Sequence, residues 1–97
     1  MELNHIKRVY FVGIGGIGMS AIARYFAKRG CQVCGYDKTE TNLTKALEQE
    51  RIAIVYVDDV ASISQDFIED SAETLIVYTP AIPKDAVILN YFKDRGF

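Results

Sequence analysis

The feature that most limits how this chain can fold is a glycine cluster placed directly after an apolar run. Residues 8–12 (RVYFV) are mostly β-branched and aromatic, as in a parallel strand buried on both faces. Residues 13–18 (GIGGIG) match the pattern G-x-G-x-x-G, and residues 17–29 continue with apolar side chains at helical spacing. A strand, a glycine turn and a helix in this order predict the first unit of a Rossmann-like α/β domain.

The rest of the chain continues this alternation of strands and helices. Further strands are expected at 32–36, 53–56 and 74–78, with a helix capped by Thr41 or Asn42 and a last helix that ends at Gly96. Residues 58–70 fit either a loop or a short, broken helix. Because crossovers between parallel strands are right-handed, the first strand lies inside the sheet and the expected order is 3-2-1-4. The 97 residues therefore predict a single three-layer domain with a parallel sheet of about four strands and helices on both faces.

Composition excludes several classes of protein. Hydrophobic residues make up 49% and charged residues 25%, which is typical of a globular domain and not of a disordered one. The 11 basic and 13 acidic residues are scattered and give a charge of −2, so nucleic acid is not an expected partner. No apolar run approaches the roughly 20 residues of a membrane helix, and the first residues lack the pattern of a signal peptide. We therefore expect a cytoplasmic protein without a membrane partner.

Metal ligands are not expected from the cysteines or the histidine. Cys31 and Cys34 form a C-x-x-C, but residues three apart on a strand point to opposite faces and cannot chelate together. His5 is the only histidine and stands in the N-terminal segment, whereas a structural metal site requires about four ligands. Buried packing for the cysteines and solvent exposure for His5 are the expected roles.

The predicted topology brings two loops together at the point where strand order reverses, between strands one and four. Ligands of such sheets bind there, outside the carboxyl ends of the strands. In the glycine motif the first glycine permits the tight turn, the second lets the backbone approach a pyrophosphate, and the third lets helix and strand pack closely. Asp37 follows Gly18 by nineteen positions, near the offset at which such domains place an acid on a ribose hydroxyl. Thr79 faces it from the other loop, so the pattern favours a nucleotide site, with plain turn residues as the alternative.

These segments resemble the Mur ligase family of peptidoglycan synthesis over essentially the whole chain. Residues 12–20 (VGIGGIGMS) are similar to the opening signature of the family members that add L-alanine. Residues 35–37 (GYD) resemble the family's G-x-D, and residues 78–83 (YTPAIP) resemble its segment after the fourth strand. One departure is Val57-Asp58, which stands where the family often has Gly-His, so a substrate contact of that histidine is not carried over.

The resemblance implies a first domain that binds the UDP part of UDP-N-acetylmuramate. The backbone N–H groups of the glycine loop would hold the diphosphate, Asp37 would lie against the uridine, and the 79–82 segment would close the opposite side. Ser20 would add a hydroxyl. The implied substrate-binding residues are Gly13, Gly15, Gly16, Ile17, Gly18, Ser20, Asp37, Thr79, Ala81 and Ile82.

The family reaction is an ATP-dependent amide formation in which Mg²⁺ neutralises the transferring phosphoryl group. It needs a P-loop, G-x-x-x-x-G-K-[ST], and these 97 residues contain none. The chain is therefore interpreted as a fragment of a larger ligase whose other domains bind ATP and Mg²⁺. It is expected to contain no catalytic residue, metal site or cofactor of its own and to be inactive alone.

Three other functions fit parts of the pattern. An NAD-binding domain of a dehydrogenase or of a potassium-transport regulator uses the same glycine turn and strand-end acid. A sister ligase that adds a recycled tripeptide to the same UDP-sugar is a second alternative, although its glycine loop differs from residues 15–20 (GGIGMS). A nucleotide-free interaction module is the third.

Overall fold

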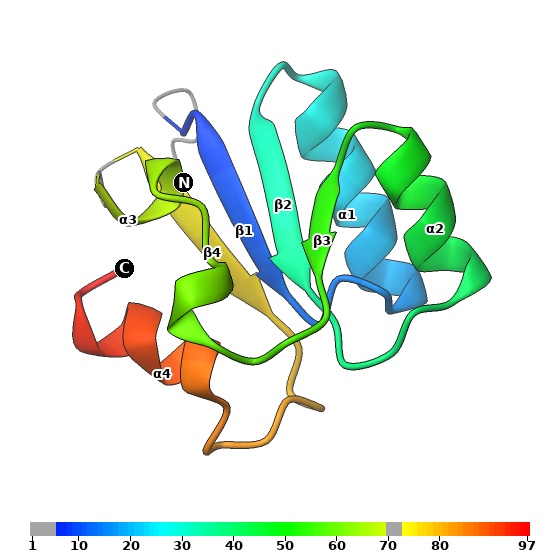
Figure 1. Cartoon of the computed structure of the whole chain (residues 1–97). Coiled ribbons are helices and arrows are strands. Elements are labelled where there is room, and N and C mark those ends of the chain that lie inside the picture. The colour runs from blue at the N-terminus through cyan, green and yellow to red at the C-terminus, as the bar shows by residue number, and fades with distance from the viewer. Residues whose placement is uncertain (1–5, 70–72) are drawn as a thin grey trace.

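A four-stranded parallel sheet lies at the centre of the computed structural model, which describes residues 6–69 and 73–97 (Figure 1). The expected order is confirmed, because the strands are arranged β3-β2-β1-β4 and every pairing is parallel. In the register, Val12 lies opposite both Tyr36 and Tyr78, so three strands end at one level. The strands are β1 (Arg8–Val12), β2 (Gln32–Tyr36), β3 (Ala53–Val55) and β4 (Thr74–Tyr78).

Helices cover both faces of the sheet, as the sequence predicts (Figure 1). One face carries α1 (Ile17–Lys28) and α2 (Asn42–Gln49), and the other carries η1 (Val60–Ser62), α3 (Asp66–Glu69) and α4 (Val87–Asp94). Residues 58–69 thus contain a 3-10 turn followed by a short helix, and residue 70 lies outside the described residues. α1 ends one residue earlier than expected, and Gly30 follows it with a φ of +89°. Thr41 caps α2 and forms a capping box with Thr44.

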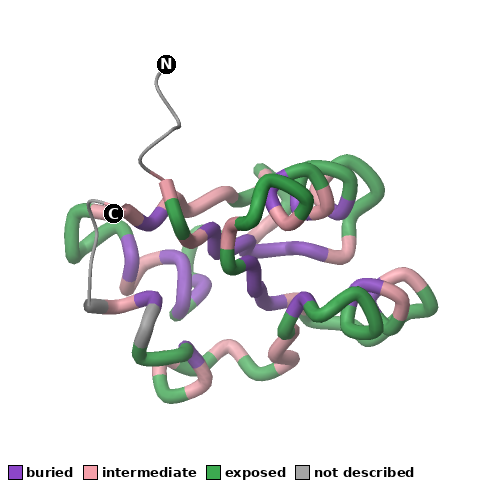
Figure 2. Tube along the Cα trace, turned by 90° about the horizontal axis from the view of Figure 1, so that it is seen from above, coloured by how far each residue is buried: buried purple, intermediate pink, exposed green. Residues whose placement is uncertain are grey.

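Two hydrophobic cores result, one on each face of the sheet. Figure 2 shows that the buried residues gather in the middle of the molecule, with exposed residues around them. Alternate residues of β1 belong to the two cores. Val9 and Phe11 pack toward α1 and α2, whereas Tyr10 and Val12 pack toward α4. The two cysteines follow the same rule, because Cys34 belongs to the α4 side and Cys31 packs against the other core.

Both cysteines are free thiols, and burial raises the pKa of Cys34 to about 12. The expected packing role of Cys34 is confirmed, since its side chain is buried. His5 lies outside the described residues.

The close packing that the motif assigns to its third glycine occurs elsewhere in the fold. A Cβ atom at Gly18 would meet nothing within 4 Å, so the expectation that this glycine lets helix and strand pack closely is wrong. Gly18 is exposed and lies in the first turn of α1. A Cβ at Gly35, in contrast, would lie 2.6 Å from the carbonyl oxygen of Phe11 and 2.9 Å from Cδ1 of Ile14. Strand β2 therefore needs glycine at this position.

We predict that Gly35→Ala lowers the free energy of unfolding by about 1–3 kcal/mol, because backbone and a buried isoleucine must move to admit a methyl group. Gly18→Ala is the matched control, with an expected change between zero and a gain of about 1 kcal/mol from helix propensity. Urea unfolding of both variants measures the difference. Equal midpoints for the two variants would contradict this assignment of the packing glycine.

Candidate functional site

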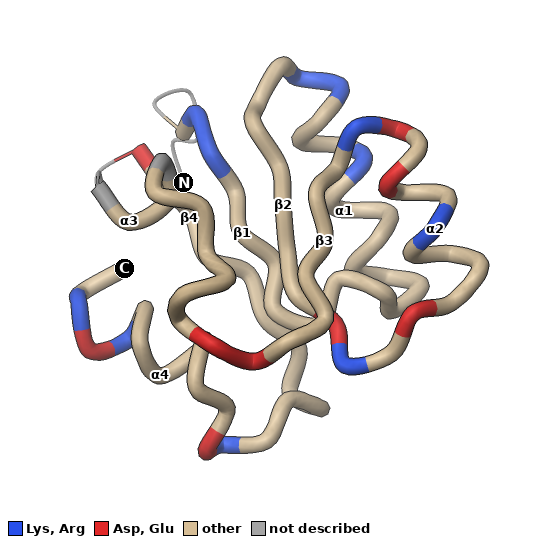
Figure 3. The backbone as a smooth tube through the Cα atoms, in the orientation of Figure 1, with Lys and Arg blue, Asp and Glu red and all other residues tan. Residues whose placement is uncertain are grey.

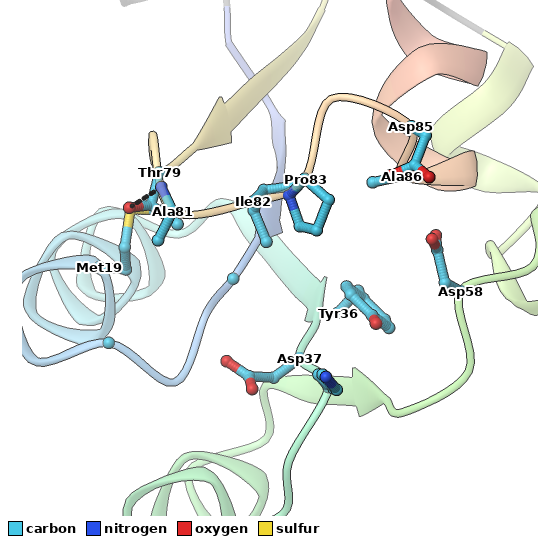
Figure 4. Close-up of a pocket in the computed structure, with 13 residues that line it drawn as sticks. Met19, Tyr36, Asp37, Asp58, Thr79, Ala81, Ile82, Pro83, Asp85 and Ala86 are labelled. Carbon is cyan, nitrogen blue, oxygen red and sulfur yellow. Dashed lines mark hydrogen bonds between the residues drawn. The ribbon is translucent and has the colours of Figure 1, made fainter.

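A cleft of about 480 Å³ opens at the carboxyl edge of the sheet, where the loops after all four strands meet (Figure 4). Its size lies within the range of small-molecule binding sites. The cleft is lined by Gly13, Gly16, Met19, Tyr36, Asp37, Lys38, Asp58, Thr79, Ala81, Ile82, Pro83, Asp85 and Ala86.

The glycine turn brings the N-terminus of α1 to this cleft. Gly13 has a φ of +94°, a conformation that side chains disfavour, so the predicted turn-forming role of the first glycine is confirmed. The N–H groups of Gly13 and Ile14 donate to the carbonyl oxygen of Tyr36 at 2.8 and 3.1 Å. A Cβ at Gly13 would also lie 2.7 Å from Cγ2 of Thr79, so the two facing loops approach closely only because this residue is glycine.

The first turn of α1 presents free backbone N–H groups. Its N-cap residue is Gly16, which has no capping side chain, and the turn contains no acidic residue. Within the described part of the chain, the amides of Ile17, Gly18 and Met19 donate to no protein acceptor. Such amides, with the partial positive charge of the helix end, form a binding site for an anion.

Asp37 occupies the position beside the second glycine of the motif. Its Oδ2 atom accepts a hydrogen bond from the Gly15 N–H at 2.7 Å, and its Oδ1 atom accepts one from the Thr39 N–H at 3.0 Å. A Cβ at Gly15 would lie 2.7 Å from the same Oδ2 atom. The absence of a side chain at Gly15 therefore makes room for a carboxylate of the protein itself.

Six of the ten predicted site residues line the cleft, and they come from all the segments that the sequence singled out: Gly13, Gly16, Asp37, Thr79, Ala81 and Ile82. The other four, Gly15, Ile17, Gly18 and Ser20, are not among the lining residues. Gly15 donates to Asp37, and the Ile17 side chain is 86% exposed. Ser20 is buried, and its hydroxyl donates to the Ile17 carbonyl oxygen at 2.9 Å. In this structure the Ser20 hydroxyl thus stabilises the first turn of α1.

Sequence reasoning missed the floor and the far end of the cleft. Tyr36 is buried and lies between Asp37 and Asp58 (Figure 4). Burial, and then the negative charges of Asp58 and Asp37, raise its pKa. A signal for Tyr36 was present, because it ends β2 at the level of Val12. Met19, Lys38, Asp58, Pro83, Asp85 and Ala86 also line the cleft without having been predicted.

Asp58 stands where the sequence departs from the family's usual Gly-His, and it caps a distant helix. Its carboxylate accepts hydrogen bonds from the N–H groups of Val87 and Ile88, each at 2.8 Å. Acidic segments thus follow both β2 and β3 at this edge of the sheet (Figure 3). The charge of the cleft is uneven, with carboxylates toward β2, β3 and α4 and an open helix N-terminus at α1.

Neither a metal site nor a membrane-spanning helix is present in the described residues. Residues 6–69 and 73–97 contain no group of three or more histidine, cysteine or acidic side chains that could hold a metal ion. Within the same ranges, no helix combines the length and the apolar character needed to cross a membrane.

Comparison with known proteins assigns this domain to a family. The model of the Mur ligase family, catalytic domain, matches residues 8–97. This chain belongs to the Mur ligase family. The expected resemblance is therefore confirmed, and the match runs from the first residue of β1 to beyond the end of α4.

Curated relatives within the family are UDP-N-acetylmuramate–L-alanine ligases. One from Christiangramia forsetii is 51% identical over 99% of this chain, and one from Cytophaga hutchinsonii is 50% identical over 100% of it. A crystal structure of UDP-N-acetylmuramate-alanine ligase from Thermotoga maritima superposes with a TM-score of 0.77 at 30% identity, covering 91% of this chain. The chain spans about a fifth of the length of these proteins, 21% of the two relatives and 19% of the solved structure.

We predict that Asp37→Ala releases the Gly15 N–H and lowers the free energy of unfolding by about 1.5–3 kcal/mol, the usual contribution of hydrogen bonds to a charged group. Asp37→Asn keeps one acceptor oxygen, so its free energy of unfolding should fall by less than that of Asp37→Ala. The amide proton of Gly15 should move upfield in the nuclear magnetic resonance spectrum of the alanine variant. Glu40→Ala, which removes an exposed carboxylate from the same loop, is the control. An unchanged Gly15 resonance in Asp37→Ala would rule out the contact.

Proposed function

We propose that this chain binds the UDP part of UDP-N-acetylmuramate and forms the nucleotide-binding domain of a ligase that adds L-alanine to it. The observation that carries the proposal is the open N-terminus of α1 at a nucleotide-sized cleft, in a member of the Mur ligase family. Its relatives are named for the same UDP-sugar. Because the rest of a relative's length lies outside these residues, the ligase activity belongs to the proposed longer protein.

The diphosphate is placed at the first turn of α1 in this proposal. The amides of Ile17, Gly18 and Met19 would donate to its oxygens, and the helix dipole would favour its charge. Each such bond is charge-assisted and is stronger than a bond between neutral groups. Thr79 faces this turn from the loop after β4. Its hydroxyl, on the opposite wall of the cleft, can both donate and accept a hydrogen bond.

The uridine is placed over the floor of the cleft. Tyr36 supplies an aromatic surface, and Ile82 and Pro83 lie across the cleft from it (Figure 4). Asp37 can accept hydrogen bonds from ribose hydroxyls, because a carboxylate has more lone pairs than the two bonds it accepts here. The base would thus lie between apolar walls while the ribose meets the carboxylate.

The ATP and Mg²⁺ of the family reaction do not fit these residues. The sequence has no P-loop, and the described residues include no cluster of metal ligands. We therefore place both groups in the remaining part of the proposed ligase. A cytoplasmic location belongs to the same proposal, and two cysteines that remain free thiols agree with it.

The proposal predicts that UDP and UDP-N-acetylmuramate shift the amide resonances of residues 15–20 in a saturable way, because this segment contains the free amides of the open helix end. NAD at the same concentration should leave them unchanged. The measurement is a parallel titration of isotope-labelled protein with each ligand. Saturable shifts with NAD alone would favour the dehydrogenase or transport-regulator alternative, and no shift with any nucleotide would favour an interaction module.

We also predict that the purified chain hydrolyses no ATP and joins no L-alanine to UDP-N-acetylmuramate. The reason is the missing P-loop lysine, without which the β- and γ-phosphates have no partner here. Release of phosphate and formation of the amide product can be followed in one assay. Turnover that co-elutes with the chain through successive columns would refute the proposal that ATP and Mg²⁺ bind outside these residues.

A further inference from the structure

Asp58 joins two segments that lie far apart in the sequence. It follows β3, yet its carboxylate accepts hydrogen bonds from the first two N–H groups of α4, at a separation of 29 positions from Val87. The local N-cap residue of α4 is Ala86, which has no side chain able to cap the helix. Asp58 therefore supplies the cap from across the cleft, and its side chain points toward Ala86 (Figure 4).

Two helices begin at this cleft, and only one of them is open to an anion. Gly16 and Ala86, the N-cap residues of α1 and α4, both line it. Each helix end presents N–H groups and a partial positive charge. At α1 the groups are free, whereas at α4 two of them are bonded to the Asp58 carboxylate.

We propose that Asp58 fixes the direction in which a nucleoside diphosphate lies in the cleft. By occupying the N-terminus of α4 it removes the competing anion site, and its charge repels a diphosphate from that end. The ligand is then directed to α1 with its nucleoside toward Tyr36. This inference rests on the proposed nucleotide binding. Asp58 forms no bond with the diphosphate and acts by closing the N-terminus of α4, so it is a positioning residue.

A second carboxylate lies at the same end of the cleft. Asp85 lines the cleft directly before Ala86 and adds a second negative charge there. The two hydrogen bonds also tie the start of α4, which directly follows the wall formed by residues 79–86, to the loop after β3.

The test is a titration of isotope-labelled protein with inorganic pyrophosphate and with UDP, with amide shifts as the readout. In the unmodified chain both ligands should shift Ile17, Gly18 and Met19 and leave Val87 and Ile88 unchanged. In Asp58→Ala, pyrophosphate should also shift Val87 and Ile88, because their N–H groups are released. UDP should then perturb both helix ends, since it can bind in two directions.

Two further variants make the test decisive. Asp58→Asn keeps a single acceptor oxygen, so pyrophosphate should shift only one of the two α4 amides, and this variant decides the matter if Asp58→Ala does not fold. Asp85→Asn removes a charge from the same end of the cleft but leaves both α4 amides bonded to Asp58, so Val87 and Ile88 should stay unshifted.

The possible results separate the two proposals. Ligand-dependent shifts at α4 in the Asp58 variants alone support the positioning role. Unchanged α4 amides in the folded Asp58 variants, or the same α4 shifts in Asp85→Asn, would overturn it. A lack of any shift at α1 in the unmodified chain would instead overturn the nucleotide-binding proposal.

Discussion

The site depends on one carbonyl group at the end of β2. The carbonyl oxygen of Tyr36 accepts hydrogen bonds from both Gly13 and Ile14, and these bonds turn the chain out of β1 and toward α1. Gly13 permits the turn with its positive φ. Asp37 follows Tyr36 directly, so the strand end that holds the turn also brings a carboxylate to the Gly15 N–H. The position of the α1 N-terminus relative to the sheet is therefore set by β2.

The sheet could be predicted from the sequence because its strands are apolar runs and the two central strands, β1 and β2, are buried on both faces. A continuous apolar run needs no alternation, and residues 8–12 and 74–78 were predicted to the residue. Strand β3 was predicted one residue too long, for a physical reason. Its pairing with β2 stops at Val55 opposite Tyr36, where β2 itself ends, and the hydroxyl of Tyr56 donates to Glu48 of α2.

The candidate site was only partly predictable, because part of it is formed by contacts between distant residues. Turn glycines and strand-end polar residues have local signatures, which is why Gly13, Asp37 and Thr79 were found. No local pattern shows that Asp58 caps a helix 29 residues away. The role of Gly18 was carried over from a general motif, whereas the actual crowding depends on how β2 passes the Ile14 side chain, and it falls on Gly35.

The charge of the cleft presents an apparent conflict, because an anion site would be lined by Asp37, Asp58 and Asp85 with a single lysine, Lys38. Backbone amides resolve it. Asp37 and Asp58 each accept two N–H bonds, so their charges are stabilised without a basic partner. Their remaining lone pairs attract donors such as hydroxyls and repel phosphate, whereas α1 attracts phosphate and has no acceptor to offer. A ligand with an anionic end and a hydroxyl-bearing end satisfies both halves, and a nucleoside diphosphate has this form.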